Sequence, residues 1–499
     1  MVVAPGQQLS GIEQFRAVKR RLESAVLARA TSLDGRAFSF QAPLHGLELA
    51  LGGYVVVGGA GDRRLGQVLS LELGRQTAAD LDVASESGDL RAGVPVEYAR
   101  GHGSLIDGEE SPFHDAPLRA AAPGEVEAWI ERTRPRGLVV GELLRAPRVP
   151  GTVEARGFDR HTFLCGQSGS GKTHALGVLL EQLLLRTRLR IVVLDPNSDF
   201  VRLGSVREGV EPALAARYAD ATRSVVVHSA TGAGRERLRL RFAELEPGTQ
   251  AALLRLDPVA DREEHAELAA LLASGRPPTV EALEAVARDQ ARSLALRVRN
   301  LGVGDFGVWA RETPGSVVEA LDDTSVRCTV VDLGSLRTRD EQALVAAAVL
   351  GELWRLRERR RPVLVVVDEA HNVCPADPGD PLTAIATEHA IRIAAEGRKY
   401  GLYLLLSTQR PQKLPENVVS QCDNLVLMRL NSRADAAFAQ EVFSFVPPGL
   451  VGLSAGFRLG ESLVAGKIAS RPALVRVGAR LSEEGGGDVP ATWAAPPSG

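Results

Sequence analysis

The chain has 499 residues, of which 44% are hydrophobic and 24% charged, and its formal net charge at pH 7 is -3. A chain of this length exceeds one ordinary core, so we expect two or three domains of a soluble globular protein. The charge balance excludes a polycation, so any contact with nucleic acid must come from a local patch or a pore.

The cysteines and the hydropathy limit the cellular setting. Four cysteines lie far apart beside apolar segments, which argues against a disulfide framework or a zinc site and favours buried thiols in a reducing cytoplasm. No run of about eighteen apolar residues occurs, and the N-terminus lacks the pattern of a signal peptide. We therefore expect a cytoplasmic protein without a membrane partner.

Two predicted units precede the first motif. Residues 12–27 carry apolar side chains at helical spacing and basic side chains on the other face, which fits binding to membranes or nucleic acid as well as packing on a neighbour. We assign them to a helical extension over 1–36. Residues 37–150 contain short β-like segments between Gly and Asp turns and predict a small β-barrel domain or sandwich. The candidate strands are 37–41, 54–57, 66–72, 96–98, 104–105 and 137–142.

A phosphate-binding motif follows this unit. The apolar segment 161–165 predicts a buried strand, and 175–185 predicts a long helix. Between them lie Gly166, Gln167, Ser168, Gly169, Ser170, Gly171, Lys172 and Thr173, which fit the P-loop pattern. Backbone N–H groups of such a loop cradle phosphates, while Lys172 reaches the β- and γ-phosphates of ATP and Thr173 binds Mg²⁺. We include His174 among the nucleotide-binding residues. A glycine-rich turn without a ligand is the alternative.

The region after the P-loop alternates between strands and helices. Residues 189–194 predict a second buried strand, and Asp195 at its carboxyl end either faces the nucleotide crevice or starts an ordinary Asp-Pro turn. Residues 203–326 are mostly rich in Ala, Leu, Glu and Arg and predict a helical insertion. A strand over 327–333 and a helix over 340–356 then resume the α/β pattern.

A second nucleotide motif ends the next predicted strand. The apolar segment 362–367 runs into Asp368 and Glu369, and we predict that Asp368 assists Mg²⁺ while Glu369 orients the attacking water. Gln409 follows a further strand and is either a γ-phosphate sensor or part of a polar loop. The motifs together predict an α/β, RecA-like P-loop ATPase core over 151–480. Residues 481–499 are predicted to be a disordered tail.

Other P-loop classes fit less well. Asp368–His371 spells the box of superfamily 2 helicases, but no second set of helicase motifs follows it. The guanine-recognition motif Asn-Lys-x-Asp and the transporter signature Leu-Ser-Gly-Gly-Gln are both absent from the sequence.

The chain instead resembles the HerA family, in the HerA/FtsK branch of ring-forming DNA translocases. The matching segments are Gly166–Thr173, Asp195–Phe200, Val365–His371, Glu396–Gly401, Ser407–Pro411 and Lys413–Cys422. The resemblance implies ATP and Mg²⁺ as cofactors, a homo-hexameric ring, and double-stranded DNA threaded through a central pore. It also implies that Arg398 is an arginine finger and Arg160 a second arginine at the site, although either arginine could be a solvated surface residue. The chain departs from the family at Asn197 and Asp199, where His and Glu are frequent.

Members of this family often work with a nuclease of the NurA type in DNA end processing, and some relatives pair with other effectors in anti-phage defence. We therefore expect an ATP-driven DNA translocase or helicase with such a partner. A nucleotide-gated ring that regulates an effector, and a motor for conjugative or protein transfer, are the alternatives. Residues 235–241 are a candidate pore loop.

Overall fold

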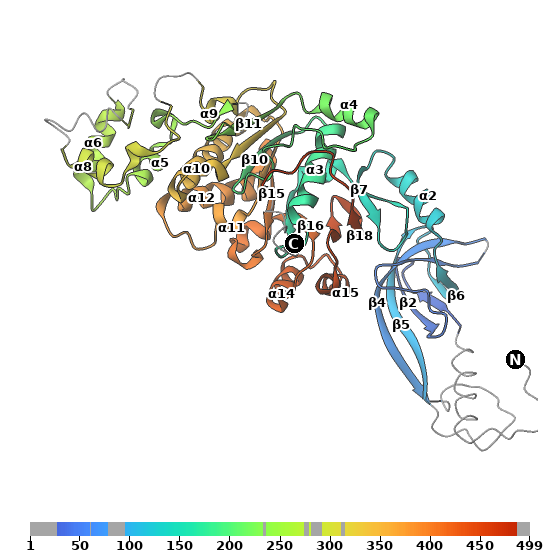
Figure 1. Ribbon diagram of the computed structural model, residues 1–499. Coiled ribbons are helices and arrows are strands. Elements are labelled where there is room, and N and C mark those ends of the chain that lie inside the picture. Colours follow the sequence, from blue (N-terminus) through green and yellow to red (C-terminus); the bar gives the residue numbers. More distant parts are fainter. Residues whose placement is uncertain are drawn as a thin grey trace, which may run out of the picture.

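The computed structural model describes residues 27–59, 61–77, 95–232, 236–273, 279–280, 292–310 and 315–486. Within them the chain forms a closed barrel and a 12-stranded sheet with helices on both faces. The barrel lies at one end of the molecule, and the helices of the insertion lie at the other (Figure 1). The basic helix predicted over 12–27 falls almost entirely outside the described residues.

The barrel is built from six antiparallel strands in the order β1-β2-β5-β4-β3-β6. They are β1 (Arg29–Ser32), β2 (Ala37–Pro43), β3 (Tyr54–Val57), β4 (Arg64–Thr77), β5 (Pro95–Asp107) and β6 (Phe113–Ala120). Alternate residues of β2 are buried, so Phe38 and Phe40 fill the interior. Gly103 of β5 admits the Phe38 ring, because a Cβ there would lie 2.2 Å from it. Closure leaves this small sheet without a free edge.

The bounds of the barrel differ from those predicted. Strand β1 lies inside the predicted helical extension, and it closes the barrel by pairing with both β2 and β6. Strand β7 (Leu138–Leu143), predicted as part of the barrel unit, instead pairs with β8 (Pro150–Val153) and with β18 (Ala469–Val477) in the large sheet. Period-2 alternation predicts that a segment is a strand but does not reveal its partner. Helix α2 (Pro123–Thr133) connects the barrel to the large sheet.

The large sheet has a parallel centre. Its order is β12-β11-β13-β10-β14-β15-β9-β16-β17-β18-β7-β8, with parallel pairing from β12 to β16 and antiparallel pairing beyond β16. The further strands are β9 (His161–Cys165), β10 (Arg190–Asp195), β11 (Val225–Ser229), β12 (Glu236–Arg237), β13 (Cys328–Asp332), β14 (Val363–Val367), β15 (Leu402–Thr408), β16 (Cys422–Leu427) and β17 (Glu461–Gly466). The predicted RecA-like α/β core, preceded by a small barrel, is confirmed.

Helices cover both faces of the parallel strands, which explains their uninterrupted apolar sequences. Alternate residues of β14 enter two different cores: Val365 packs with α10 (Arg339–Arg355) and α12 (Pro381–Glu396), whereas Leu364 packs on the side of α3 (Lys172–Arg186). Smaller helices complete the core. They are α4 (Pro212–Ala221), α11 (Ala370–Val373), α13 (Glu416–Val419), α14 (Arg433–Val442) and α15 (Pro448–Gly452).

The insertion is shorter than the predicted 203–326, because α4 and β11 belong to the core. Its described helices are α5 (Pro247–Leu253), α6 (Arg262–Ala273), α8 (Arg292–Asn300) and α9 (Val317–Ala320). Helix α5 packs against both α10 and α12 and so joins the insertion to one face of the sheet.

The predicted disordered tail also begins too early. Residues 481–486 pack across the core, and Ser482 is fully buried. Leu481 and Ser482 donate backbone hydrogen bonds to the buried Glu181 on α3, which is a contact between distant segments that composition does not reveal. The remaining residues of the predicted tail, 487–499, lie outside the described part of the chain. None of the helices described here combines the length and the apolar character of a membrane-spanning segment.

Candidate nucleotide-binding site

The P-loop connects the carboxyl end of β9 to the first turn of α3. Gly169 and Gly171 have φ values of +70° and +91°, which favour glycine. A Cβ at Gly166 would lie 2.7 Å from the Ser170 Oγ atom, so this position also requires close approach. Ser168 and Gly169 are exposed at the tip of the loop. The loop therefore presents backbone N–H groups at a helix N-terminus, which is the geometry that binds anions.

Lys172 and Glu369 meet in front of this loop. The Lys172 Nζ atom lies 2.8 Å from Glu369 Oε1, and both side chains are almost fully buried. Glu369 directly follows the end of β14 with a φ of +41°, a strained conformation for a residue other than glycine. His371 Nδ1 lies 3.3 Å from Glu369 Oε2 and 3.1 Å from Thr408 Oγ1. The structure thus brings together the lysine and the glutamate that were predicted from two separate motifs.

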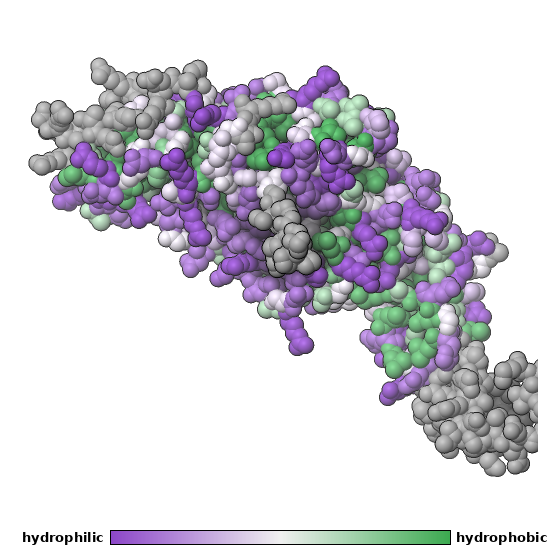
Figure 2. All heavy atoms as spheres, in the orientation of Figure 1, coloured by the Kyte–Doolittle hydropathy of each residue, from purple (hydrophilic) through white to green (hydrophobic). Residues whose placement is uncertain are grey.

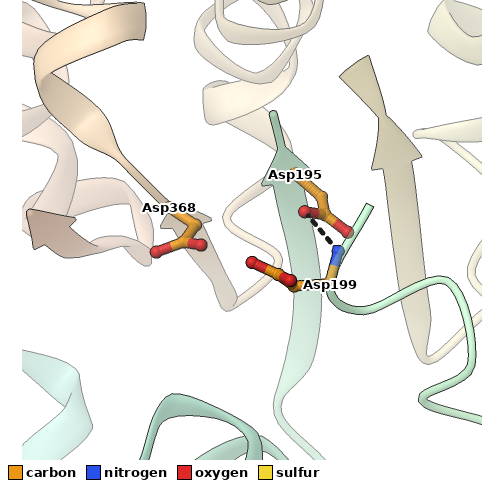
Figure 3. A group of neighbouring side chains, drawn as sticks. All are labelled: Asp195, Asp199 and Asp368. Atoms are coloured by element: carbon orange, nitrogen blue, oxygen red, sulfur yellow. Dashed lines mark hydrogen bonds between the residues drawn. The ribbon is translucent and has the colours of Figure 1, made fainter. Parts of the chain in front are cut away.

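Three carboxylates gather at the same edge of the sheet. One oxygen of each of Asp195, Asp199 and Asp368 lies within 4.8 Å of the others (Figure 3). Burial raises the pKa of Asp195 to about 7 and that of Asp199 to about 6, and it also raises the pKa of Asp368. Because carboxylate oxygens are the ligands that Mg²⁺ prefers, these residues fit the metal expected beside a bound nucleotide.

The remaining predicted residues at this edge are Thr173, His174 and Gln409. Thr173 is half-buried in the first turn of α3, and Gln409 is half-buried just after β15. His174 contacts the C-terminal segment: its Nε2 atom lies 2.9 Å from the Gly478 carbonyl oxygen and its Nδ1 atom 2.9 Å from Glu484 Oε1. His174 therefore links the P-loop helix to residues 478–486.

Arg160 and Arg398 lie at the opposite edge of the sheet. Arg160 immediately precedes β9, and Arg398 lies in a short 3-10 helix just before β15. Both arginines approach the same oxygen of Asp423, at 3.4 Å and 3.3 Å. The five residues of β9 separate Arg160 from the P-loop by roughly 17 Å at about 3.3 Å per residue. The structure therefore does not bring either arginine to the P-loop of its own chain.

Two parts of the site were not predicted. Asp199 lies four residues beyond Asp195 in a loop that folds back, because Asp195 accepts hydrogen bonds from the backbone N–H groups of Asp199 (3.0 Å) and Phe200 (2.8 Å). A short side chain that caps its own loop is a local signal that could have indicated this turn. The C-terminal segment 478–486 gives no such signal.

Comparisons with known proteins agree with the motifs. Residues 138–286 match the family described as "Helicase HerA, central domain". The DNA double-strand break repair helicase HerA of Sulfurisphaera tokodaii is 32% identical over 175 residues, 33% of this chain and 34% of that protein. The protein of the same name from Pyrococcus furiosus is 23% identical over 410 residues, 68% of this chain and 69% of that protein. The first match thus spans about a third of its relative.

Among solved structures, VirB4 of Thermoanaerobacter pseudethanolicus overlaps 69% of this chain and 96% of its own chain, with 17% identity and a TM-score of 0.48. The P-loop geometry and the carboxylates at the neighbouring strand ends agree with this similarity: the chain is a P-loop ATPase whose central domain is similar to that of the HerA helicases.

Proposed function

We propose that this protein is an ATP-hydrolysing motor that moves double-stranded DNA through a ring of six subunits. The observation that carries the proposal is the meeting of Lys172 and Glu369 in front of the P-loop. Asp368 lies beside them at the end of the same strand as Glu369. A lysine for phosphates, a carboxylate for a cation and a second carboxylate for water are what phosphoryl transfer to water needs.

In this proposal each residue at the carboxyl edge has one role. The P-loop N–H groups and Lys172 bind the phosphates, and Thr173 and Asp368 hold Mg²⁺, which neutralises charge on the β- and γ-phosphates. Glu369 orients the attacking water, and Gln409 senses the γ-phosphate. Since Lys172 pairs with Glu369, an arriving phosphate would draw Lys172 away and free the carboxylate for water.

The ring is supported by the position of the arginines. Arg160 and Arg398 lie at the amino edge of the sheet, away from their own P-loop, and their side chains are 31% and 42% exposed. We assign them to the γ-phosphate of a neighbouring subunit, where the planar guanidinium suits a phosphate. The Lys172 site of one chain would then be completed only by an adjacent chain.

The DNA substrate is proposed from the relatives, two of which are named as DNA double-strand break repair helicases. Within the candidate pore loop, Arg241 pairs with Glu244 and Glu319 and is therefore not free for DNA, while Arg235 lies outside the described residues. We also propose a nuclease or other effector as partner. Exposed leucines on the barrel, Leu33 and Leu73, together with the apolar residues that gather over the barrel strands in Figure 2, support this end as the docking region.

The proposal is tested by measuring ATP hydrolysis with and without duplex DNA. Duplex DNA should stimulate the wild-type rate. Glu369→Gln should keep ATP binding and lose hydrolysis, whereas Lys172→Ala should lose binding. The exposed Glu358 provides a matched control, since Glu358→Gln should hydrolyse ATP at the wild-type rate. Hydrolysis without stimulation by DNA would favour a nucleotide-gated scaffold or a motor for protein transfer, and hydrolysis by Glu369→Gln at the wild-type rate would reject the assigned water-orienting residue.

A further inference from the structure

We propose that Asp199 and Asp368 form a divalent-cation site that fills before the nucleotide arrives. The inference deepens the proposed function and rests on it, because it concerns the order in which the same site is loaded. The proposed site differs from one that the cation enters only together with ATP and in which the cation contacts the protein through Thr173.

The spacing of the carboxylates suits a shared cation. Asp199 and Asp368 come from the loop after β10 and from the end of β14, and Figure 3 shows their carboxylates facing each other. Their oxygens lie within 4.8 Å. Two oxygens on opposite sides of one ion are separated by about 4 Å for Mg²⁺ and about 5 Å for Ca²⁺. The gap therefore fits one divalent ion that both carboxylates bind directly.

Asp368 supplies a second observation. Its side chain is 0% exposed, and neither of its oxygens has a hydrogen-bond partner among the residues that the structure describes. The neighbouring cation, Lys172, is held by Glu369 at 2.8 Å. A buried carboxylate without a hydrogen-bond partner is costly, and this one faces the Asp199 carboxylate (Figure 3). A divalent cation would satisfy both groups.

Asp195 has a different role in this site. Its carboxylate accepts backbone hydrogen bonds from Asp199 and Phe200 and thus shapes the loop that carries Asp199. The C-terminal segment fixes the loop from the other side: Gly485 N–H donates to the Asp199 carbonyl oxygen at 3.1 Å, and a Cβ at Gly486 would lie 2.7 Å from Asp199 Oδ1. Asp195 is therefore a positioning residue, and Asp199 and Asp368 are the cation ligands.

The test uses Mn²⁺ and the nucleotide-free full-length protein. Electron paramagnetic resonance of free Mn²⁺ should show one bound ion per chain, displaced by excess Mg²⁺. Asp199→Asn and Asp368→Asn should each weaken binding by at least about tenfold. Asp220→Asn is the matched control, because Asp220 is an exposed carboxylate paired with Arg223 on the outside of α4; it should bind as the wild type does. Thermal melting of each variant verifies the fold.

Three results would overturn the inference: no Mn²⁺ bound at millimolar concentration, wild-type affinity in Asp199→Asn, or loss of binding in the Asp220→Asn control. A proton shared by the two carboxylates would give the first of these results. Binding of a fluorescent ATP analogue to the same samples separates the two proposals. If ATP binds and Mn²⁺ alone does not, only this inference fails. If Mn²⁺ binds but Lys172→Ala binds ATP normally, the proposed nucleotide site fails.

Discussion

Replacing Glu181 by alanine should destabilise the ATPase core by about 3–5 kcal/mol, because the buried Arg480 loses its nearer carboxylate and keeps only that of Glu484, at 3.8 Å. Glu181 on α3 is 1% exposed, and Arg480 of the C-terminal segment is 0% exposed. The Glu181 carboxylate accepts hydrogen bonds from the backbone of Leu481 (2.8 Å) and Ser482 (2.9 Å), from the Ser482 hydroxyl (2.6 Å) and from Arg480 Nε (3.4 Å). Its removal leaves all four donors without this acceptor.

The magnitude can be divided between the charge and the backbone. Two buried N–H groups that lose their acceptor cost about 1–1.5 kcal/mol each, and the Arg480 guanidinium that loses its nearer carboxylate accounts for the rest. The double variant Glu181→Leu with Arg480→Met removes the buried charges but still leaves the two backbone N–H groups without an acceptor. It should therefore lower the free energy of unfolding by only about 2–3 kcal/mol. The double variant should therefore be more stable than Glu181→Ala, although it changes more of the structure.

The assay is urea unfolding followed by circular dichroism, combined with hydrogen exchange of the peptide that covers 478–486. Exchange is needed because a chain with a separate barrel need not unfold in one step. Glu181→Ala should lose protection in this peptide first, since the segment is held by the bonds that were removed. A cost below about 1 kcal/mol for Glu181→Ala, or a double variant less stable than the single one, would refute the reasoning.

The other predictions concern the ring, the pH dependence and DNA. Arg398→Ala and Lys172→Ala should each be nearly inactive alone, and mixing the two variants should partly restore ATP hydrolysis, because an arginine from the neighbouring subunit is worth about 10³–10⁵ in rate. If mixed rings recover no hydrolysis, the arginine finger is not Arg398, and Arg160 is the next residue to change. Burial lowers the pKa of His161 to about 4, and its Nδ1 atom accepts a hydrogen bond from the Leu404 N–H at 2.9 Å. As pH falls, the unfolded chain therefore takes up this proton before the folded chain does, and the free energy of unfolding should decrease between about pH 6.5 and about pH 4. His161→Asn, whose amide oxygen can accept the same hydrogen bond, should flatten this part of a plot of urea midpoint against pH. The affinity for duplex DNA should fall with salt at a slope of roughly -0.9 per phosphate contacted, and a salt-independent affinity would contradict binding through phosphates.

The central part of the fold was predictable because its signals are local. An apolar strand, a Gly-rich loop and a helix lie within 26 residues from His161 to Arg186, and the chain itself joins them. The same holds for β14 and the two acids that follow it. In doubly wound sheets the carboxyl ends of neighbouring parallel strands form one crevice. That rule is sufficient to bring Lys172, Asp195 and Asp368 together without any long-range information.

The errors arose where the partner of a segment is distant in sequence. Strand β7 reads as one more strand of the barrel unit, yet its partner β18 begins more than 300 residues later. The segment 478–486 has the composition of a tail, but it is held by Glu181 and by the loop around Asp199. Composition indicates only the local structural preference of a segment. These contacts form only when the whole sheet is assembled, so composition does not predict them. Asp199 was missed for the same reason, since its role requires the loop after β10 to face β14.

The placement of the arginines gives β9 a particular role in the proposed ring. Arg160 lies at the amino end of this strand and the P-loop at its carboxyl end, and β9 pairs on both sides with strands that begin beside Arg398 and Asp423. Strand β9 is buried and paired with β15 on one side and β16 on the other, and such a strand resists bending. A phosphate bound at one end would thus be mechanically connected to arginines that act on the next subunit at the other end. Asp423 contacts both arginines, and their contact with the phosphate of the next subunit would release it. Each occupied site would then alter the site of only one of its two neighbours in the ring.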